Sequence, residues 1–572
     1  MKGNIFALFT ASTYYFVKLP ITIFFIILFC CDCFSQKVYL KIASSNPTES
    51  QTIDSIGYRK IFENTKTLNS EVHSFSEKLL KSGYLESQQT GFSKINDSTF
   101  QFQFLLHKKT NSIHIYIGNI NLPDFFEEPN PTDHHYLQLP LKEVESFMSN
   151  LLKKLEKKGY SLAKIQLINF RTDNNKLFAD LEINTNKQQQ LNSIVVNGYE
   201  KFPKNHLHNL NRYYKNKIFN QETVQQIHSE FEKYNFIKPI KYPEILFTTD
   251  STKVYVYLEK SKSNTFEGFI GFSNNDKDKI SFNGYIDLTL SNALHGGEKF
   301  ALYWKSDGNK QTTFNAGIEI PYLFKSPLGI KAQLNIFKQD STFQNTNTNI
   351  NLGYYFKYNK KLFIGYQSTE SNSIKNLNNT GLSDFESNFI TGSYEYNRTD
   401  TQSYLFPEKT NFTVKLGYGT RNSKTESNTQ YLLSLLASHN FNINSSNIIN
   451  IKTHNFLLQS DSYIINELFR FGGINSIRGF NENSLQGNFL SSILTEYRYL
   501  FSSGIYIHSI LDYGYQQDKA TNNSNKLLGI GFGLGVATKN GLFNIIYANG
   551  STDNQQIQLS NSIIHISFKS IF

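Results

Sequence analysis

The sequence predicts N-terminal α+β repeats followed by an all-β, antiparallel transmembrane barrel of about 16 strands. Three observations lead to this fold class. A short pattern recurs at intervals of 76 residues before residue 262, and residues 263–572 alternate polar and apolar side chains with little helical periodicity. After the first 35 residues, no segment reaches 18 continuous apolar residues, so the chain could cross a bilayer only as a closed barrel.

The composition agrees with a chain whose strands present two different faces. Of the 572 residues, 39% are hydrophobic, which is low for a large soluble globule, while 15% are aromatic. Abundant aromatic residues on a polar background are typical of a barrel with a lipid-facing outside and a wet inside. The net charge of +10 is spread along the chain without a dense basic run, so we expect no nucleic-acid partner.

Residues 1–35 have the pattern of a signal peptide. Lysines precede an apolar run at residues 19–31 that is too short to span a bilayer, and Ser35 ends a small-residue cleavage pattern. All the cysteines of the chain lie in this segment, namely Cys30, Cys31 and Cys33. The exported chain is therefore expected to have no disulfide, no thiolate metal site and no cysteine nucleophile. A lipoprotein anchor on Cys30 or Cys31 is an alternative, which the bulky residues before them disfavour.

The exported part begins with three similar units. Gly83, Gly159 and Asn235 hold the same place in each unit, 76 residues apart, where a residue that ends an amphipathic helix belongs. Two strand-like runs separated by a polar turn follow each of these residues, and each unit opens with another strand. The spacing predicts modules at residues 36–111, 112–190 and 191–262.

The order of strand, helices, strand and strand resembles the POTRA domain, a periplasmic module of about this length. The third unit is the most similar, since residues 193–210 contain the strand, the glycine and the following helix of that family. The resemblance implies that the modules bind extended client chains by adding them to an exposed sheet edge. A plain structural spacer is the alternative.

Residues 263–572 are predicted to form the barrel. Within residues 528–536 one face is apolar and the other has no side chains, because Leu528, Ile530, Phe532, Leu534 and Val536 alternate with Gly529, Gly531, Gly533 and Gly535. About 16 such runs follow one another to the end of the chain. A soluble β-sandwich also alternates, but the number of runs and their aromatic ends favour an outer-membrane barrel.

An irregular stretch interrupts the strands after the eleventh run. It carries two short motifs, made of Phe471, Gly472 and Gly473 and of Arg478, Gly479 and Phe480. A third motif on the thirteenth run contains Asp512 and Gly514. In this order and at these strand positions, the motifs resemble the outer-membrane insertase and translocase superfamily that includes BamA, TamA and FhaC. The layout with three modules is closest to that of TamA.

The resemblance implies that this loop folds back into the barrel and that Arg478 pairs with Asp512 on strand thirteen. Physical chemistry agrees, because a guanidinium stays charged and a buried unpaired charge is costly. Strand parity points Asp512 and Glu496 inward, which makes Glu496 a second candidate partner. The glycine row at residues 529–535 should leave room for the inserted loop. A surface loop with a solvated arginine is the alternative.

The last run, residues 562–572, resembles the C-terminal signal by which assembly machinery recognises barrels. Its outward face carries Phe568 and Phe572. Closure of the barrel would pair this run with the first one, near residues 266–273. In the superfamily this seam is short and can open laterally.

No catalytic constellation accompanies these features. The sequence contains no G-x-S-x-G, no Walker A loop and no H-E-x-x-H, so we expect no enzyme, no cofactor and no metal site. The pair His134 and His135 is interpreted as solvated. Because no energy-coupling motif is present either, any insertion or export would draw on the folding free energy of the client.

The expected function is assembly, insertion or translocation of client proteins, with the barrel in the bacterial outer membrane and the modules in the periplasm. Expected partners are unfolded outer-membrane or secreted clients, outer-membrane lipid, and periplasmic or inner-membrane assembly partners. An exporter of the two-partner-secretion type is one alternative. A passive channel or structural barrel, tethered by its modules, is the other.

Overall fold

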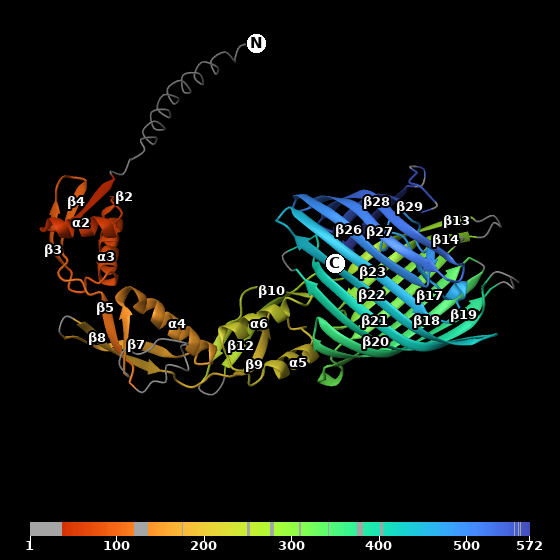
Figure 1. Cartoon of the computed structure of the whole chain (residues 1–572), viewed down its shortest axis with the longest axis horizontal. Helices are drawn as coiled ribbons and strands as arrows, with labels where there is room; N and C mark the ends of the chain where they lie inside the picture. Colours follow the sequence, from red (N-terminus) through yellow and green to blue (C-terminus); the bar gives the residue numbers. More distant parts are fainter. Residues whose placement is uncertain are drawn as a thin grey trace, which may run out of the picture. The chain divides into compact units, whose positions relative to one another are not determined.

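The structure is a computed structural model that describes residues 37–118, 135–173, 176–248, 252–274, 280–307, 311–340, 342–374, 381–400, 403, 405–553, 555–558, 560 and 562–572. The signal peptide predicted for residues 1–35 lies outside these ranges, as does His134. The chain divides into two compact units, residues 1–188 and residues 189–572, and each has its own sheets (Figure 1). Within the described ranges, no helix is both long and apolar enough to cross a membrane.

The first unit opens with a four-stranded sheet of order β2-β1-β4-β3. Its central strands β1 (Val38–Ala43) and β4 (Thr99–Leu105) are parallel, and β2 (Ile61–Phe62) and β3 (Gln88–Lys94) pair antiparallel at the edges. Helices α2 (Pro47–Ile56) and α3 (Thr65–Lys81) bury Ile53 and Phe75 in one cluster with the strands. Burial of each such side chain contributes about 1.5–3 kcal/mol, so this cluster fixes both helices on the sheet.

A second four-stranded sheet follows, with the order β6-β5-β8-β7. Its strands are β5 (Ser112–Tyr116), β6 (Tyr136–Pro140), β7 (Lys164–Asp173) and β8 (Lys176–Asn184). The short turn η2 (Leu141–Glu143) leads into helix α4 (Val144–Lys157), whose Leu151 and Leu155 are fully buried against the sheet. Strand β7 forms one edge, and most of its side chains are exposed.

The repeated glycines end helices as their position in the repeat predicts. Gly83 has a φ of 102° and Gly159 a φ of 91°, values at which a side chain would be strained. Asn235, at the same place in the third repeat, does not adopt a positive φ. Its side chain instead donates a 3.2 Å hydrogen bond to Ser291 of the barrel. The equivalent position thus follows a helix in all three repeats. In the first two it is a glycine with a positive φ, and in the third it is an asparagine that binds the barrel.

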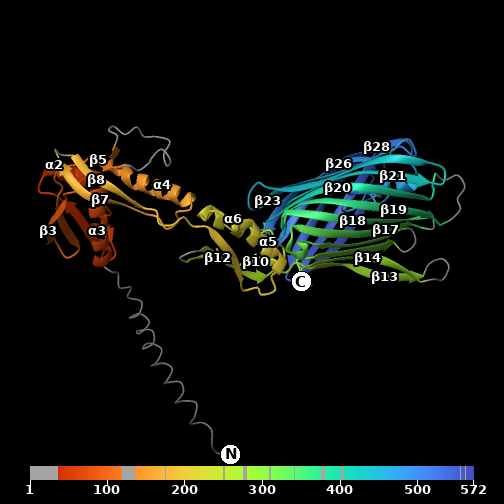
Figure 2. The ribbon, with the colours of Figure 1, turned by 90° about the horizontal axis from the view of Figure 1, so that it is seen from below.

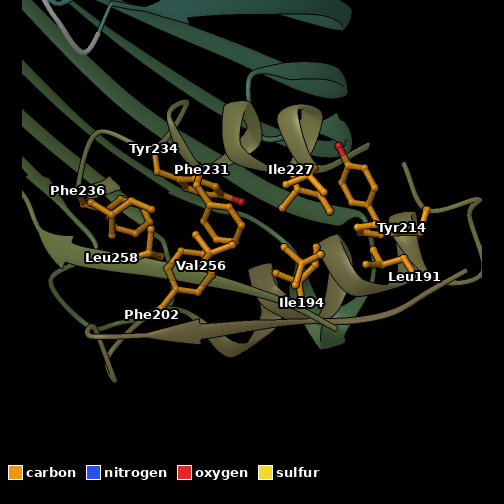
Figure 3. Packing of buried hydrophobic residues seen from close by; sticks show 14 residues of the cluster. Leu191, Ile194, Phe202, Tyr214, Ile227, Phe231, Tyr234, Phe236, Val256 and Leu258 are labelled. Atoms are coloured by element: carbon orange, nitrogen blue, oxygen red, sulfur yellow. The ribbon is translucent and has the colours of Figure 1, made fainter. Parts of the chain in front are cut away.

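The second unit begins with a third small sheet. Strand β12 (Thr252–Lys260) pairs parallel with β9 (Leu191–Asn197) and antiparallel with β10 (Ile237–Pro239) and β11 (Glu244–Phe247). Helices α5 (Lys204–Tyr214) and α6 (Gln221–Phe231) complete it. Figure 3 shows side chains from both helices and from the sheet meeting in one cluster, including Phe231, Tyr234 and Leu258.

The division of residues 36–262 into three separately folded modules stays a prediction. We expect limited proteolysis of a fragment covering residues 37–262 to cut first near residue 111 and near residues 188–190, because these positions join one sheet to the next. The products can be identified by mass spectrometry. A fragment that resists cleavage as a single piece would contradict the three-module interpretation.

Sixteen strands of the described residues form a closed antiparallel barrel, as the sequence predicts (Figure 2). They are β13 (Thr265–Asn274), β14 (Ile280–Ser291), β15 (Lys299–Asp307), β16 (Gln311–Ile320), β17 (Leu328–Gln339), β18 (Phe343–Lys357), β19 (Lys360–Ser373), β20 (Phe385–Thr399), β21 (Glu408–Ser423), β22 (Ser427–Asn442), β23 (Asn447–Gln459), β26 (Phe489–Ser502), β27 (Ile505–Asp518), β28 (Asn523–Thr538), β29 (Gly541–Thr552) and β30 (Ile563–Ile571). In this order β23 is the eleventh strand, β26 the twelfth and β27 the thirteenth. The irregular stretch of the sequence lies between β23 and β26.

The strands alternate between an exposed apolar face and an inner polar face. On β28, the side chains of Ile530 and Phe532 are 42% and 64% exposed, while Gly529 and Gly533 on either side of them are buried. On β27, Leu511 and Tyr513 point outward and Asp512 is completely buried. An apolar outer surface and a polar interior are the pattern of a barrel in lipid.

The barrel closes through a short seam. Strand β13 pairs with β30 at only three positions, Thr265 with Ile571, Phe266 with Ser570 and Glu267 with Lys569. Two further backbone hydrogen bonds join Asn264 and Phe572, at 3.0 and 3.2 Å. The neighbouring ladders are longer, with ten pairs between β13 and β14 and eight between β29 and β30. The seam is therefore paired at one end of these strands.

The third sheet is fastened to the end of the barrel by buried contacts. His206 on α5 is completely buried, and its ring lies 4.6 Å from that of Tyr322 and 5.4 Å from that of Tyr234. A side chain at Gly297, in the turn after β14, would overlap the His206 ring. On α6, Glu230 is 4% exposed and binds Lys357 at the end of β18 at 2.6 Å.

Acid is expected to weaken this junction. Burial lowers the pKa of His206 from 6.5 to about 3, so below pH 6.5 the unfolded chain takes up a proton that the folded chain does not. Stability therefore falls as the pH drops from 6.5 towards 3, by about 2 kcal/mol at pH 5. The measurement is the urea concentration at which α5 becomes susceptible to protease, compared at pH 7 and pH 5.

The His206→Phe variant should lose this pH dependence, because its ring fills the same space and does not titrate. His73→Gln is the matched control, since the His73 side chain is 82% exposed on α3 and should have no effect on α5. An unchanged pH dependence in His206→Phe would contradict the assignment.

Candidate functional site

The irregular stretch forms a loop, residues 460–488, that packs against the inner wall of the barrel. Within it, the turn η4 (Ile465–Glu467) precedes a two-stranded hairpin of β24 (Phe469–Phe471) and β25 (Leu485–Gly487). Phe471 and Ile477 of the loop share a buried cluster with three inward side chains of the wall, Leu490, Leu494 and Leu527. A small hydrophobic cluster therefore joins the loop to the inner wall of the barrel.

Arg478 lies at the centre of this contact and is only 4% exposed. Its Nε donates to Asp512 Oδ2 at 2.8 Å and its Nη2 to Asp512 Oδ1 at 2.5 Å, which is the bidentate fork of an arginine and a carboxylate. The backbone N–H of Arg478 also donates to Asp512 Oδ2, at 2.9 Å. Asp512, on β27, is completely buried. The structure thus brings together the two residues whose pairing the sequence resemblance implies.

Glu496 on β26 completes the charge balance. It accepts a hydrogen bond from Nη1 of Arg478 and, at 2.7 Å, one from Nε of Arg498. Two arginines therefore meet two carboxylates, Asp512 and Glu496, in a buried network without a net charge. A buried ionic group is tolerated only when it is paired and hydrogen-bonded in this way.

Glycines on the wall make room for the loop backbone. A side chain at Gly529 on β28 would collide with the carbonyl oxygen of Arg478. At Gly514 on β27, an added Cβ would lie 2.5 Å from Ile477 Cδ1, and at Gly550 on β29 it would lie 2.6 Å from the Gly479 oxygen. Three neighbouring strands thus leave a side-chain-free surface under the motif.

The sequence led us to expect that the whole glycine row at residues 529–535 makes room for the loop. In the structure, only Gly529 of this row lies against the loop backbone. Gly533 and Gly535 accommodate the rings of their cross-strand neighbours His508 and Tyr506. The reason is geometric. Successive inward positions of one strand lie about 6.6 Å apart, and the loop backbone passes the strand at the height of one such position.

The loop glycines provide turns that other residues would strain. Gly472, Gly473 and Gly479 have φ values of 103°, 94° and 86°. Phe480 packs beside the loop cluster, and its ring would meet a side chain at Gly550. The motif residues predicted from the sequence therefore lie together, on both sides of Arg478.

The two C-terminal phenylalanines lie elsewhere, on the outside of the barrel. Phe568 is 44% exposed on β30, and Phe572, directly after the strand, is 51% exposed. Neither contacts the loop network described above. The structure thus separates the C-terminal residues from the inner site.

Sequence reasoning missed two further anchors of the loop. Arg421 on β21 is completely buried and binds Glu467 at 2.9 Å and Glu426 at 2.7 Å. Glu482 accepts a 2.9 Å hydrogen bond from the hydroxyl of Tyr303 and forms an ion pair with Lys305. Strand parity places Arg421 inside the barrel, and this signal could have found it. No local pattern in the sequence links Glu482 to β15.

In the part of the chain that the structure describes, no cluster of three or more His, Cys, Asp or Glu side chains could hold a metal ion. The interactions of this site are ion pairs and packing between the loop at residues 460–488 and the inner wall of the barrel.

No protein-family profile matches the chain, and no characterised protein matches its sequence. Solved structures do match. CdiB from Acinetobacter baumannii superposes with a TM-score of 0.50 at 12% identity, covering 88% of this chain and 98% of the matched chain. CdiB from Escherichia coli has a TM-score of 0.50 at 11% identity and covers 93% and 100%. BamA from Haemophilus ducreyi lacking POTRA domains 1-3 has a TM-score of 0.47 at 14% identity and covers 81% and 100%.

At these identities, the likeness to the two CdiB structures establishes the fold. It extends over most of the chain, including the small sheets before the barrel. The chain therefore has the fold of these two CdiB structures, and in it small α+β sheets precede a closed 16-stranded antiparallel barrel.

Proposed function

We propose that this protein is an assembly factor of the bacterial outer membrane that inserts or translocates client proteins. Its modules, at residues 36–111, 112–190 and 191–262, bind extended segments of a client in the periplasm. The barrel then delivers the client through its seam or its lumen. The activity is not enzymatic, because the folding free energy of the client drives it.

The short seam is the observation that carries this proposal. Separating β13 from β30 breaks three register pairs and the two bonds between Asn264 and Phe572. Separating β20 from β21 would break fifteen register pairs. With a net contribution of about 0.5–1.5 kcal/mol for each backbone hydrogen bond, the seam is the place where this barrel opens at the lowest cost.

The strands at the seam also offer edges to a client. Beyond Glu267, β13 continues for residues 268–274 without a partner on the seam side, and β30 has residues 563–568 in the same state. A strand with free N–H and C=O groups is a template for another strand. A client hairpin can therefore extend either edge while it folds.

The small sheets support client capture in the same way. In the first unit, β3 and β7 lie at sheet edges, and Phe92 and Phe170 on these strands are 58% and 61% exposed. Main-chain pairing provides affinity without sequence specificity, and exposed aromatic side chains add apolar contact. This combination suits a protein that receives many unfolded clients.

Depletion of the protein tests the proposal. We expect one or more other outer-membrane or surface proteins to fall in abundance, as measured by quantitative proteomics of isolated outer membranes. Accumulation of a secreted protein in the periplasm, with the membrane proteins unchanged, would favour the exporter of the two-partner-secretion type. No change in any outer-membrane, surface or secreted protein would contradict both and leave a passive channel or structural barrel.

A further inference from the structure

The loop that carries Arg478 reaches both sides of the seam. On the C-terminal side, Gly479 lies against Gly550 of β29, one strand before β30. On the N-terminal side, Glu482 binds Tyr303 and Lys305 of β15, two strands after β13. In the closed barrel four strand spacings separate β29 from β15, about 19 Å along the wall. Residues 479–482, together with the side chains of Glu482, Tyr303 and Lys305, link the two sides inside the lumen.

The contact lies at the level where pairing of the seam stops. The barrel register aligns Tyr303 with Asp287 and Glu267, and Glu267 is in the last paired position of β13. Lys305 is two residues further along its strand and aligns through Tyr285 with residue 269 of β13, which lies beyond the last position paired with β30. His565 of β30 is close enough to Lys305 and Glu482 to interact electrostatically with both.

We propose that Glu482, Tyr303 and Lys305 form a clasp that holds the seam closed from inside the barrel. The ion pair connects the wall on the N-terminal side to a loop that is fixed on the other side by Arg478 and Asp512. Opening the seam moves β15 away from β29 and breaks the clasp. Glu482 is a positioning residue, since it acts on the seam through the loop.

The clasp rests on the proposed function only for its biological purpose, because its effect on the seam can be measured without any client. Hydrogen exchange of backbone amides reports the population of the open seam. The peptides to follow contain residues 264–267 and 569–572, whose amides form the seam ladder. Peptides from β21 and β22 serve as an internal reference, since their ladder has thirteen pairs.

Glu482→Lys should increase the exchange rate of the seam peptides in the full-length protein. The expected factor is about two to five, because the Lys305 and Glu482 side chains are 39% and 28% exposed and such pairs are modest in strength. A second contact of the loop limits the effect, since Arg470 stays over the rings of Phe337 and Phe343.

Exchanging the charges tests the pair directly. The double variant Lys305→Glu with Glu482→Lys should return the exchange rate to that of the unaltered protein. Glu482→Gln, which removes the charge without adding bulk, should accelerate exchange in the same direction as Glu482→Lys. Glu386→Lys is the matched control, because Glu386 is exposed on β20, and it should change nothing.

Unchanged exchange in both Glu482 variants would overturn the clasp. Faster exchange that the charge exchange does not reverse would also overturn it. Neither result bears on client assembly, which the depletion experiment measures, so failure of the clasp and failure of the proposed function can be told apart.

Discussion

Arg478→Ala is expected to release the loop from the barrel wall and to impair client assembly, while most barrel strands still form. The substitution removes the fork to Asp512 and leaves that carboxylate buried without its charge partner. Glu496 is affected less, because it keeps Arg498. Breaking one half of a buried ion pair typically costs about 3–5 kcal/mol, more than the few contacts around Ile477 and Phe480 can offset.

The position of the loop can be measured through the accessibility of a cysteine introduced at Ser476, a residue that is 7% exposed. We expect a bulky impermeant thiol reagent to label this cysteine from outside the cell in the Arg478→Ala background and not in the unaltered one. Arg398→Ala is the matched control, since Arg398 is exposed on β20. Labelling that is equally fast without the substitution would mean that the loop lies on the surface and that the motif has been misinterpreted.

Three further experiments separate charge from geometry. Arg478→Lys should restore only part of the protection, because an ammonium group cannot bind Asp512 and Glu496 with a planar fork. A cysteine pair at positions 478 and 512 should crosslink in intact outer membranes, since the structure places these residues in contact. In a double-mutant cycle, Arg478→Ala with Asp512→Ala should be less harmful than the sum of the single substitutions, because no unpaired carboxylate remains.

Gly529→Ala is expected to displace the loop in the same way as the loss of Arg478, with a smaller effect, although it changes no charge. The added methyl group would collide with the carbonyl oxygen of Arg478, and neither β28 nor the loop backbone can move freely. Overpacking of this kind costs about 1–3 kcal/mol and should shift the loop away from the wall. The readouts are labelling at Ser476→Cys and the abundance of outer-membrane clients.

Gly392→Ala provides the matched control. Gly392 also lies within a barrel strand, β20, but a Cβ there would meet nothing within 4 Å. Alanine in a strand is not intrinsically worse than glycine, so any general effect on the barrel should be the same in both variants. If Gly529→Ala kept the loop protected and assembly normal, the loop backbone could not lie against β28 as the structure has it.

The sequence by itself determined the architecture, because its signals are local. Alternation with period 2 identifies each barrel strand and its inward face, and this parity alone is enough to place Asp512 and Glu496 inside the barrel. The 76-residue spacing located Gly83, Gly159 and Asn235 within the repeats. The order of the short motifs relative to the strand count indicated the loop between the eleventh and twelfth strands.

Only the tertiary structure decided how the loop and the seam are built. That Gly550 lies under Gly479, that Glu467 meets Arg421, and that Glu482 reaches Lys305 depend on which distant strands face one another across the lumen. The three-pair length of the seam depends on where the register of β13 and β30 ends. Closing a barrel adds these relations between strands far apart in the chain. Local periodicity carries no information about them, because many registers satisfy the same alternation of inward and outward residues.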